Sequence, residues 1–355
     1  ELEELSGRYI IKSPHPDILP GLTLVKALAA KVRNSMRINV VTGIYVTEIL
    51  RDDEKVCGVR GFGKAGEEVI ISGPAVVLAT GGAGAVYLRN DNQKKILGQG
   101  YYLAARAGLE LWDMEFVQFY PLVIAEPSLP SLILFPPYPK EAKLINDSGE
   151  DVLAKSDLGG INSAIMKKRD EFSAYLYQED RIAPVYMDFR HVAEKMWDVH
   201  PFTVLKKLRF DFRSRPVRVS PAAHFFMGGI RIDEQGQTAV RGLYACGEIL
   251  WGLHGANRMG GNAMMECLVT GGIAGRHAAQ CGQNAPATDW TGSGRMPAGT
   301  ASHPSRGAAD LKRLLRRVKE LASRYAGVVR SERGIQEGLL HVTEIKEQYE
   351  ALRLD

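Results

Sequence analysis

One glycine-rich segment constrains this chain more than any other part of it. Gly-Leu-Tyr-Ala-Cys-Gly-Glu (residues 242–248) precedes His-Gly-Ala-Asn-Arg-Met-Gly-Gly-Asn-Ala-Met-Met-Glu (residues 254–266), and the small-residue run 270–275 follows. Closely spaced glycines let the backbone approach a flat ligand, and peptide N–H groups at a helix start favour negative charge. We expect the small-residue run to begin a tightly packed helix. The segment, with its acid, histidine and arginine, therefore predicts a nucleotide or flavin site.

Three further motifs occur elsewhere in the chain. They are Val-Leu-Ala-Thr-Gly-Gly (77–82), then Gly-Gln-Gly with Ala-Arg-Ala-Gly and Asp-Met-Glu-Phe-Val-Gln (98–118), and His-Phe-Phe-Met-Gly-Gly-Ile (224–230). Together with the glycine-rich segment, and in this order, they resemble the fumarate reductase, succinate dehydrogenase and L-aspartate oxidase flavoprotein superfamily. The resemblance covers roughly residues 20–330 and implies FAD as the cofactor.

The resemblance implies an α/β fold with three parts. These are an incomplete Rossmann-like FAD-binding domain with an inserted β-meander, a mobile α+β capping domain and a helical C-terminal tail. Prolines mark the crossing into the cap, and Gly, Pro, Ser and Thr dominate the linker before the tail. The expected boundaries are 1–122 and 223–281 for the FAD-binding domain, 123–222 for the cap, 282–307 for the linker and 308–355 for the start of the helical region.

Hydrophobic spacing predicts the individual elements of these parts. The uninterrupted apolar run 76–79 is typical of a buried parallel strand that ends at a ligand. The meander strands are expected at 46–50, 56–62 and 68–72, and further strands at 38–42 and 230–232. Helices are expected at 21–38, 101–111, 163–169, 202–210, 308–325 and 331–352.

The loop that holds the pyrophosphate of FAD is expected well upstream of residues 77–82. Residues 61–66 have the spacing GxGxxG, but they lie between two strand-like runs, so we interpret them as a hairpin turn. We therefore expect the N-terminal part of the FAD-binding domain to be absent and the chain by itself to bind flavin poorly.

The resemblance assigns the cofactor contacts. Glu248 matches the glutamate that bonds the ribityl or ribose hydroxyls, although an acid at a helix start is the alternative interpretation. Gln99 stands where the family has an aspartate, and its neutral amide can still form hydrogen bonds. The expected FAD-binding residues are Ala79, Thr80, Gly81, Gly82, Gln99, Gly247, Glu248, Asn262, Ala263 and Met264.

The resemblance also assigns substrate contacts. His224 and Arg258 match the catalytic pair that binds a substrate carboxylate, for which a guanidinium offers a planar fork. A packed core histidine and a structural ion pair are the alternatives. His254 and Tyr120 are the remaining expected substrate-binding residues, with Tyr-Pro-Leu (120–122) in place of the family's His-Pro-Thr.

The family's cap also carries an arginine that protonates the substrate. The matching segment of this chain, residues 138–150, contains no arginine. Lys140 or Lys143 is the expected substitute, although a lysine is a point charge on a flexible stem and does not replace a guanidinium. Both the missing arginine and the altered residues at 120–122 predict low activity on fumarate.

Composition excludes several other functions. The net charge is +4, and the basic run 312–319 has leucines at helical spacing, so it predicts a solvated helix face and no nucleic-acid binding. The four cysteines form no CxxC pair, which predicts no metal site and buried, reduced thiols in the cytoplasm. No apolar run reaches the about 18 residues of a membrane span, so any position at the inner face of the membrane would depend on a partner.

The sequence thus predicts an FAD-dependent oxidoreductase that transfers a hydride between flavin and a carboxylate-bearing substrate other than fumarate. The alternative is a flavin electron-transfer or scaffold protein with a vestigial substrate site. In both cases the resemblance allows a partner that carries iron–sulfur clusters for electron transfer.

Overall fold

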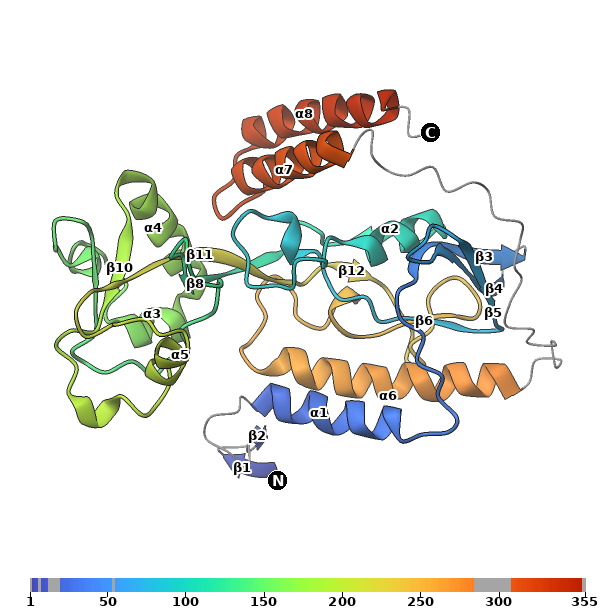
Figure 1. The fold of residues 1–355 in the computed structure, drawn as a ribbon, viewed down its shortest axis with the longest axis horizontal. Helices are drawn as coiled ribbons and strands as arrows, with labels where there is room; N and C mark the ends of the chain where they lie inside the picture. Colours follow the sequence, from blue (N-terminus) through green and yellow to red (C-terminus); the bar gives the residue numbers. More distant parts are fainter. Residues whose placement is uncertain (1, 6–7, 12–19, 53–54, 284–307, 353–355) are drawn as a thin grey trace.

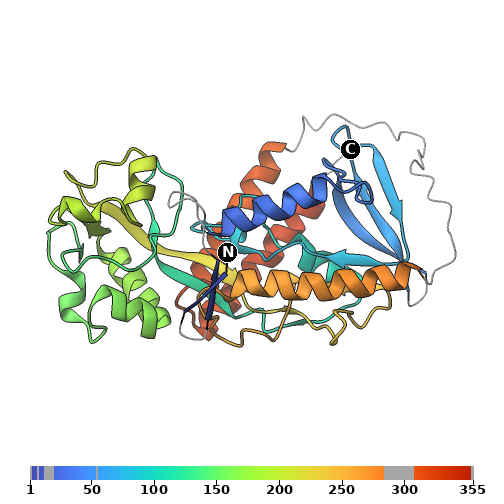
Figure 2. The same ribbon diagram turned by 90° about the horizontal axis from the view of Figure 1, so that it is seen from below.

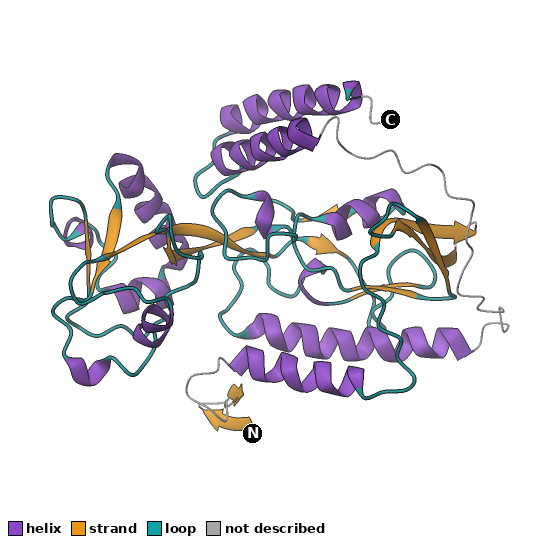
Figure 3. Cartoon of the chain, in the orientation of Figure 1, coloured by secondary structure: helices purple, strands orange, loops and turns teal. Residues whose placement is uncertain are grey.

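The computed structural model describes residues 2–5, 8–11, 20–52, 55–283 and 308–352. Figures 1 and 3 show an elongated mixed α/β molecule, with a small α+β part at one end and a larger part at the other. A pair of C-terminal helices lies along one side of the larger part. The expected domain boundaries remain predictions, but the buried hydrophobic side chains form two clusters, one in each part.

The larger part is built around two parallel strands. β6 (Val76–Leu78) pairs with β13 (Leu243–Ala245), so the parallel strand predicted at 76–79 is confirmed. Because the strands are parallel, the Thr-Gly-Gly loop and the Cys-Gly-Glu turn follow them at the same edge. The other elements here are α1 (Pro20–Arg33), α2 (Gln99–Arg106), α6 (Asn262–Gln283), β7 (Leu111–Trp112), β12 (Gly229–Ile230), η1 (Gly84–Val86) and η4 (Gly247–Ile249).

The predicted meander is also confirmed. β3 (Tyr45–Asp52), β4 (Lys55–Phe62) and β5 (Glu68–Ser72) form an antiparallel sheet in that order. The GxGxxG-like residues form the turn from β4 to β5, where Gly63 N donates to Glu67 O at 2.8 Å. They are therefore a hairpin connection and hold no phosphate loop. At the N-terminus, β1 (Leu2–Leu5) and β2 (Arg8–Ile11) form a separate antiparallel pair.

Three element predictions in the larger part were wrong. Segment 38–42 forms no strand, because no described strand pairs with it and its branched side chains are exposed. The helix predicted at 101–111 ends at Arg106, since Gly108 adopts φ +87°. The run 270–275 does not begin a helix, because α6 already begins at Asn262, eight residues earlier. Thr270 lies inside α6, where its hydroxyl accepts a hydrogen bond from Gly247 N at 3.0 Å.

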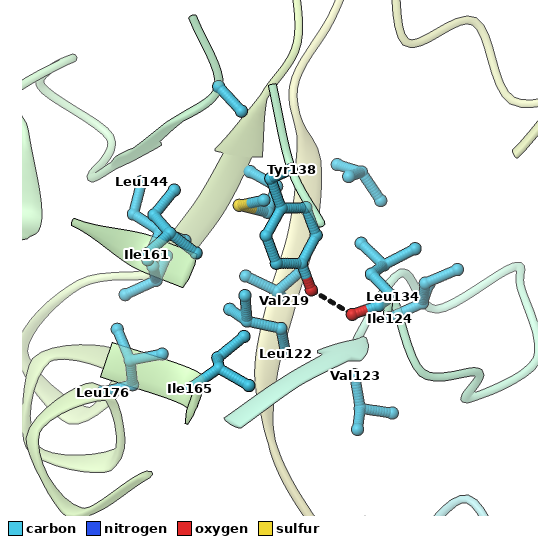
Figure 4. Close-up of a cluster of buried hydrophobic side chains, with 14 of the residues drawn as sticks. Leu122, Val123, Ile124, Leu134, Tyr138, Leu144, Ile161, Ile165, Leu176 and Val219 are labelled. Atoms are coloured by element: carbon cyan, nitrogen blue, oxygen red, sulfur yellow. Dashed lines mark hydrogen bonds between the residues drawn. The ribbon is translucent and has the colours of Figure 1, made fainter. Parts of the chain in front are cut away.

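The cap part contains a four-stranded antiparallel sheet with the order β8-β11-β10-β9. Figure 4 shows its core, where Leu122, Leu144 and Leu176 are fully buried and Tyr138 donates its hydroxyl to the Leu134 carbonyl. The strands are β8 (Val117–Ile124), β9 (Lys143–Ile145), β10 (Val185–Asp188) and β11 (Val217–Phe226). The helices are α3 (Ile161–Lys167), α4 (Arg169–Ile182), α5 (Phe202–Lys207) and the short η2 (Val152–Lys155) and η3 (Glu194–Met196).

Strands β8 and β11 join the two parts. They pair with each other over Val117 to Ile124 and Phe226 to Val219, and together they run from the larger part into the cap (Figure 1). A second contact between the parts is the ion pair of Arg89 Nη1 with Asp180 Oδ2 on α4, at 2.8 Å. The cap is therefore connected through a continuous antiparallel ribbon.

The C-terminal helices α7 (Ala308–Tyr325) and α8 (Glu332–Ala351) agree with the predicted pair. Ser331 caps α8 by accepting from Gly334 N at 3.1 Å. The pair is anchored by Tyr87, whose hydroxyl donates to Ala326 O at 2.9 Å, and by Leu88 N, which donates to Ser323 Oγ at 2.8 Å. The linker assigned to 282–307 lies almost wholly outside the described residues.

The expectation of buried thiols was wrong. Cys57 and Cys267 are exposed, while Cys246 and Cys281 are partly exposed. Cys267 is exposed because it faces a cavity described below. The described residues include no cluster of three or more metal-ligating side chains and no helix long and apolar enough to span a membrane.

Candidate active site

A cavity of about 1120 Å³ lies between the cap and the larger part. Its walls come from β8, β11, the end of α3, the start of α4, η4, the glycine-rich loop, the start of α6 and residues 24–28 of α1. Figures 1 and 2 show the starts of α1 and α6 close to each other beside the junction with the cap. The cavity thus brings together residues far apart in sequence, among them Tyr120, His224, Glu248, Arg258, Ala263 and Met264 from the predicted set.

Arg258 is the buried cation of this cavity. Only 5% of the residue is exposed, and its Nη2 donates to Gln118 Oε1 at 3.0 Å and to His224 Nε2 at 2.9 Å. Its guanidinium also lies 4.6 Å from the centre of the Phe225 ring. Burial lowers the pKa of Arg258, and the positive charge of Arg169 lowers it further. Arg258 is therefore a desolvated cation whose environment favours an anion.

His224 connects Arg258 to an acid that the sequence reasoning missed. The Nδ1 atom of His224 lies 2.8 Å from Oδ2 of Asp91, while its Nε2 faces Arg258. The side chain is 24% exposed and lines the cavity from β11. The structure therefore brings the predicted pair His224 and Arg258 into direct contact and adds a carboxylate behind the histidine.

Arg169 is a second missed residue. It is the first residue of α4 and lines the cavity from the cap side. Its Nη2 donates to the Arg258 carbonyl at 2.6 Å and to the Asn257 side chain. Burial lowers its pKa, and the charge of Asp170 opposes that shift. The cap thus places an arginine at the cavity from outside the segment 138–150, in which the sequence has none.

The predicted lysine substitutes lie elsewhere. Lys140 and Lys143 line a separate cavity of about 630 Å³ inside the cap, beside Asn162 and the start of α3. That cavity shares no residue with the one that contains Arg258. The cations that line the site from the cap side are therefore Lys167 and Arg169, and not a lysine from residues 138–150.

The cofactor-facing wall is organised around Glu248. Its Oε1 accepts from Phe226 N at 3.0 Å, and Gly82 N also donates to its carboxylate. Burial raises its pKa, whereas these hydrogen bonds and His224 lower it. A Cβ at Gly82 would lie 2.3 Å from Oε1, so the Thr-Gly-Gly loop can reach Glu248 only with glycine there. The two motifs are thus in direct contact.

Several predicted cofactor residues lie outside the cavity. Ala79 and Thr80 are exposed at the end of β6, Gly247 is buried and Asn262 is exposed, and none of the four lines the cavity. Gln99 accepts from Leu97 N at 3.1 Å and donates to Lys95 O at 3.0 Å, so both ends of its amide serve the local turn. Its assignment to FAD stays a prediction, without support from this geometry.

The predicted substrate residue His254 is not brought to the cavity either. Its Nε2 lies 3.0 Å from Glu266 Oε2, with side chains only 4% and 1% exposed. The His254 ring packs edge-on against the Phe225 ring, with ring centres 5.3 Å apart. The Arg258 guanidinium lies against the same Phe225 ring. His254 therefore supports the wall behind Arg258 and does not reach a ligand in the cavity.

The glycine at position 100 allows a testable prediction about the cofactor-facing loop. A Cβ at Gly100 would lie 1.8 Å from Thr80 Oγ1 and 2.7 Å from Ile249 Cδ1. In a helix, alanine is normally favoured over glycine by about 0.5–1 kcal/mol. Here we expect Gly100→Ala to lower the free energy of unfolding by about 1–3 kcal/mol, because the site is overpacked.

Thermal and urea unfolding of the variant measure this effect. Gly160→Ala is the matched control, since nothing lies within 4 Å of a Cβ at that position. It should change stability by less than about 0.5 kcal/mol. Equal stability of Gly100→Ala and the wild type would show that the contact between α2 and the Thr-Gly-Gly loop is loose.

The described residues fit one side of a bound flavin. Ala263 and Met264 lie in the first turn of the 22-residue helix α6 and line the cavity, where peptide N–H groups favour negative charge. A Cβ at Gly255, Gly260 or Gly261 would meet nothing within 4 Å, so this loop is open on its outer side. These features accept a flat, partly anionic group beside Arg258.

Comparisons with known proteins agree with this geometry. The chain is 32% identical over 336 residues to L-aspartate oxidase of Agrobacterium fabrum, which covers 92% of this chain and 61% of the relative. It is 34% identical over 255 residues to a component of the fumarate reductase (CoM/CoB) of Methanothermobacter marburgensis, covering 68% and 46%. The chain thus spans about half to three fifths of the length of these curated relatives.

Solved structures have the same fold. A quinol-fumarate reductase with menaquinol molecules superimposes with a TM-score of 0.77 at 28% identity, covering 94% of this chain and 62% of that chain. The Mycobacterium smegmatis Sdh1 complex in the apo form gives 0.69 at 27% identity, covering 93% and 58%. The family model described as FAD binding domain matches residues 6–264. The chain therefore belongs to the FAD binding domain family, among the fumarate reductase, succinate dehydrogenase and L-aspartate oxidase flavoproteins, and its cofactor is FAD.

Proposed function

We propose that this chain provides the substrate site of an FAD-dependent oxidoreductase that transfers a hydride between flavin and a carboxylate-bearing substrate other than fumarate. One observation carries the proposal. Arg258 and Arg169 line the same cavity, and the pKa of Arg258 is lowered by burial and further by the positive charge of Arg169. Two partly buried guanidinium groups at one cavity favour an anionic ligand between them.

In this proposal the chain's residues have distinct roles. Arg258 and His224 bind the substrate carboxylate. FAD, when bound, supplies the site that accepts or donates the hydride. Arg169 holds the proton that is delivered to, or taken from, the adjacent substrate carbon, and its lowered pKa makes proton transfer easier than from an exposed arginine. The apolar surroundings exclude water from the reacting atoms.

The cap side of the cavity disfavours a second carboxylate. Tyr120 stands close to Phe135, with ring centres 6.0 Å apart, and Pro136 and Ile165 complete this wall. Burial raises the pKa of Tyr120, so its hydroxyl stays uncharged. A second carboxylate against this wall would lose its hydration and meet an uncharged hydroxyl and apolar side chains, with Arg169 as the nearby cation, whereas an apolar substituent would be accommodated. A monocarboxylic substrate with an apolar end is therefore favoured over a C4 dicarboxylate.

Steady-state assays on the FAD-loaded full-length protein test this proposal. With reduced viologen as electron donor, we expect kcat/KM for crotonate to exceed that for fumarate by at least about 10-fold, since one charged contact is worth about 1.5–3 kcal/mol. Oxidation of the saturated acids with a quinone or dye acceptor tests the reverse direction. Faster turnover of fumarate would contradict the assignment of substrate class.

The alternative, an electron-transfer or scaffold protein, predicts a different result. Flavin would then exchange electrons with artificial carriers while no carboxylic acid bound or reacted. The two arginines at one cavity argue against a vestigial site, because their mutual repulsion costs free energy when no anion lies between them. An iron–sulfur electron-transfer partner is compatible with the proposed enzyme, as the source or acceptor of its electrons.

A further inference from the structure

Asp91 lies behind the proposed carboxylate site and contacts it only through His224. The side chain of Asp91 is 11% exposed, and its Oδ2 is 2.8 Å from His224 Nδ1. It does not line the cavity. An acid this buried needs strong partners, and its second oxygen has one in the Asn92 side chain, whose Nδ2 donates to Oδ1 at 3.2 Å.

The backbone around Asp91 is built to hold this carboxylate in place. Asp91 N donates to Ala223 O at 3.3 Å, and Ala223 N donates to Arg89 O at 3.0 Å. Asn92 Nδ2 also lies 3.3 Å from Ala223 O and 3.2 Å from His224 O. A Cβ at position 84 would lie 2.3 Å from Asn92 Nδ2, so the Asn92 side chain fits here because residue 84 is glycine. The loop and β11 therefore fix Asp91 and His224 relative to each other.

These contacts determine which nitrogen of His224 carries hydrogen. Arg258 Nη2 lies 2.9 Å from Nε2, and a guanidinium has only donors. Nε2 must accept that hydrogen bond, so Nδ1 carries the hydrogen and donates it to Asp91. A carboxylate that binds Arg258 can bond Nε2 only if Nε2 carries a hydrogen as well.

We propose that Asp91 is a positioning residue that orients His224 and allows it to take up a proton when the substrate carboxylate binds. This inference rests on the proposed function. The proton comes from solvent and ends on Nε2, which then donates to the carboxylate while Nδ1 donates to Asp91. No electrons move in this step, and the site gains one negative charge from the ligand and one positive charge from the proton.

The charges around His224 make this coupling necessary. Arg258 opposes a second cation beside it, and Arg169 adds positive charge from the cap. Glu248 interacts favourably with a charged His224 from η4, and Tyr120 of β8 is uncharged with its ring 5.9 Å away. Asp91 is the acid in direct contact with His224, and the incoming carboxylate would be a second anion beside the ring, so that together they offset the repulsion by Arg258.

Calorimetry on the FAD-loaded full-length protein tests the proposal, with crotonate as the probe. Titrations in two buffers with different ionisation enthalpies give the number of protons taken up on binding. We expect an uptake approaching one proton per site for the wild type and less than about half of that for Asp91→Asn, with affinity reduced at least about 10-fold. Asp188→Asn, which removes another buried carboxylate from the cap sheet, should leave both quantities unchanged.

A measurement on the wild type alone covers the case in which Asp91→Asn does not fold. Histidine-selective nitrogen NMR, with the His224 signals identified by their loss in His224→Gln, reports the tautomer directly. We expect hydrogen on Nδ1 without ligand and on both nitrogens with crotonate. Hydrogen on Nε2 alone in the free protein would overturn the proposal.

The outcomes separate this inference from the proposed function. If crotonate and the other carboxylic acids fail to bind the wild type, the proposed function is wrong and the inference is overturned with it. If crotonate binds with the same proton uptake in the wild type and Asp91→Asn, the carboxylate site stands and the role of Asp91 is refuted.

Discussion

Replacing Arg169 by glutamine is expected to lower turnover of a carboxylic acid substrate by about 100- to 10,000-fold, the usual cost of losing a general acid or base. Glutamine keeps a donor of similar shape for the Asn257 side chain but holds no proton to transfer. Because Arg258 and His224 remain, binding of the carboxylate should weaken much less than kcat falls. The measurement is kcat and KM on FAD-loaded full-length protein.

Lys168→Gln is the matched control for this variant. Lys168 precedes Arg169 in the chain, bonds the Asp157 carbonyl at 3.3 Å and does not line the cavity. Removing its charge should leave kcat within about twofold of the wild type, as expected of a change outside the site. If Arg169→Gln retained more than a tenth of wild-type kcat, Arg169 would not be the proton carrier.

Replacing Arg258 by lysine is expected to lower kcat/KM by about 10- to 150-fold, which corresponds to about 1.5–3 kcal/mol for a charged hydrogen bond. An ammonium cannot reach Gln118, His224 and a ligand at once, because it lacks the extended planar donor array of a guanidinium. If Arg258 serves the substrate, flavin content and melting temperature should stay near the wild-type values.

The same preparation distinguishes a structural role for Arg258. In that case Arg258→Lys would release flavin or lower the melting temperature, while the remaining holoenzyme kept its rate per flavin. Arg231→Lys is the control, since Arg231 also lies against aromatic rings, 5.1 Å from Trp112 and 5.2 Å from Trp251, outside the cavity. An unchanged rate per flavin in Arg258→Lys would remove the main support for an anion site.

The sequence predicted those features that depend on local pattern or on the motifs. The meander and the parallel strand β6 have alternating or uninterrupted apolar runs, and the structure contains both. The contact between His224 and Arg258 joins two residues 34 positions apart, and no spacing rule predicts it. It was expected only because both motifs resemble those of one family.

The two missed residues show what the sequence pattern does not reveal. Arg169 lies in a run of charged residues typical of a solvated helix start, beyond the segment 138–150 where the resemblance places a cap arginine. The sequence did contain one signal for Arg169. The helix dipole disfavours a cation in the first turn of a helix, so an arginine at that position indicates a role other than helix stabilisation. Asp91 contacts His224, which lies 133 positions later in the sequence. Asp91 also stands between two asparagines, which are typical of surface loops and so gave no sign of this role.

The ribbon of β8 and β11 has a mechanical consequence. Within the described residues both chain crossings between the cap and the larger part run through it, so a rotation of the cap must change its twist. Tyr120 and His224 lie on these strands, whereas Arg258 lies on the glycine-rich loop. His224 is held to the larger part by Asp91 and Asn92. Opening the cavity would therefore turn Tyr120 of β8 and Arg169 of α4 away from His224 and Arg258. Admission of substrate and assembly of its binding site would then be a single torsional movement, and an open enzyme would hold no substrate in a reactive position.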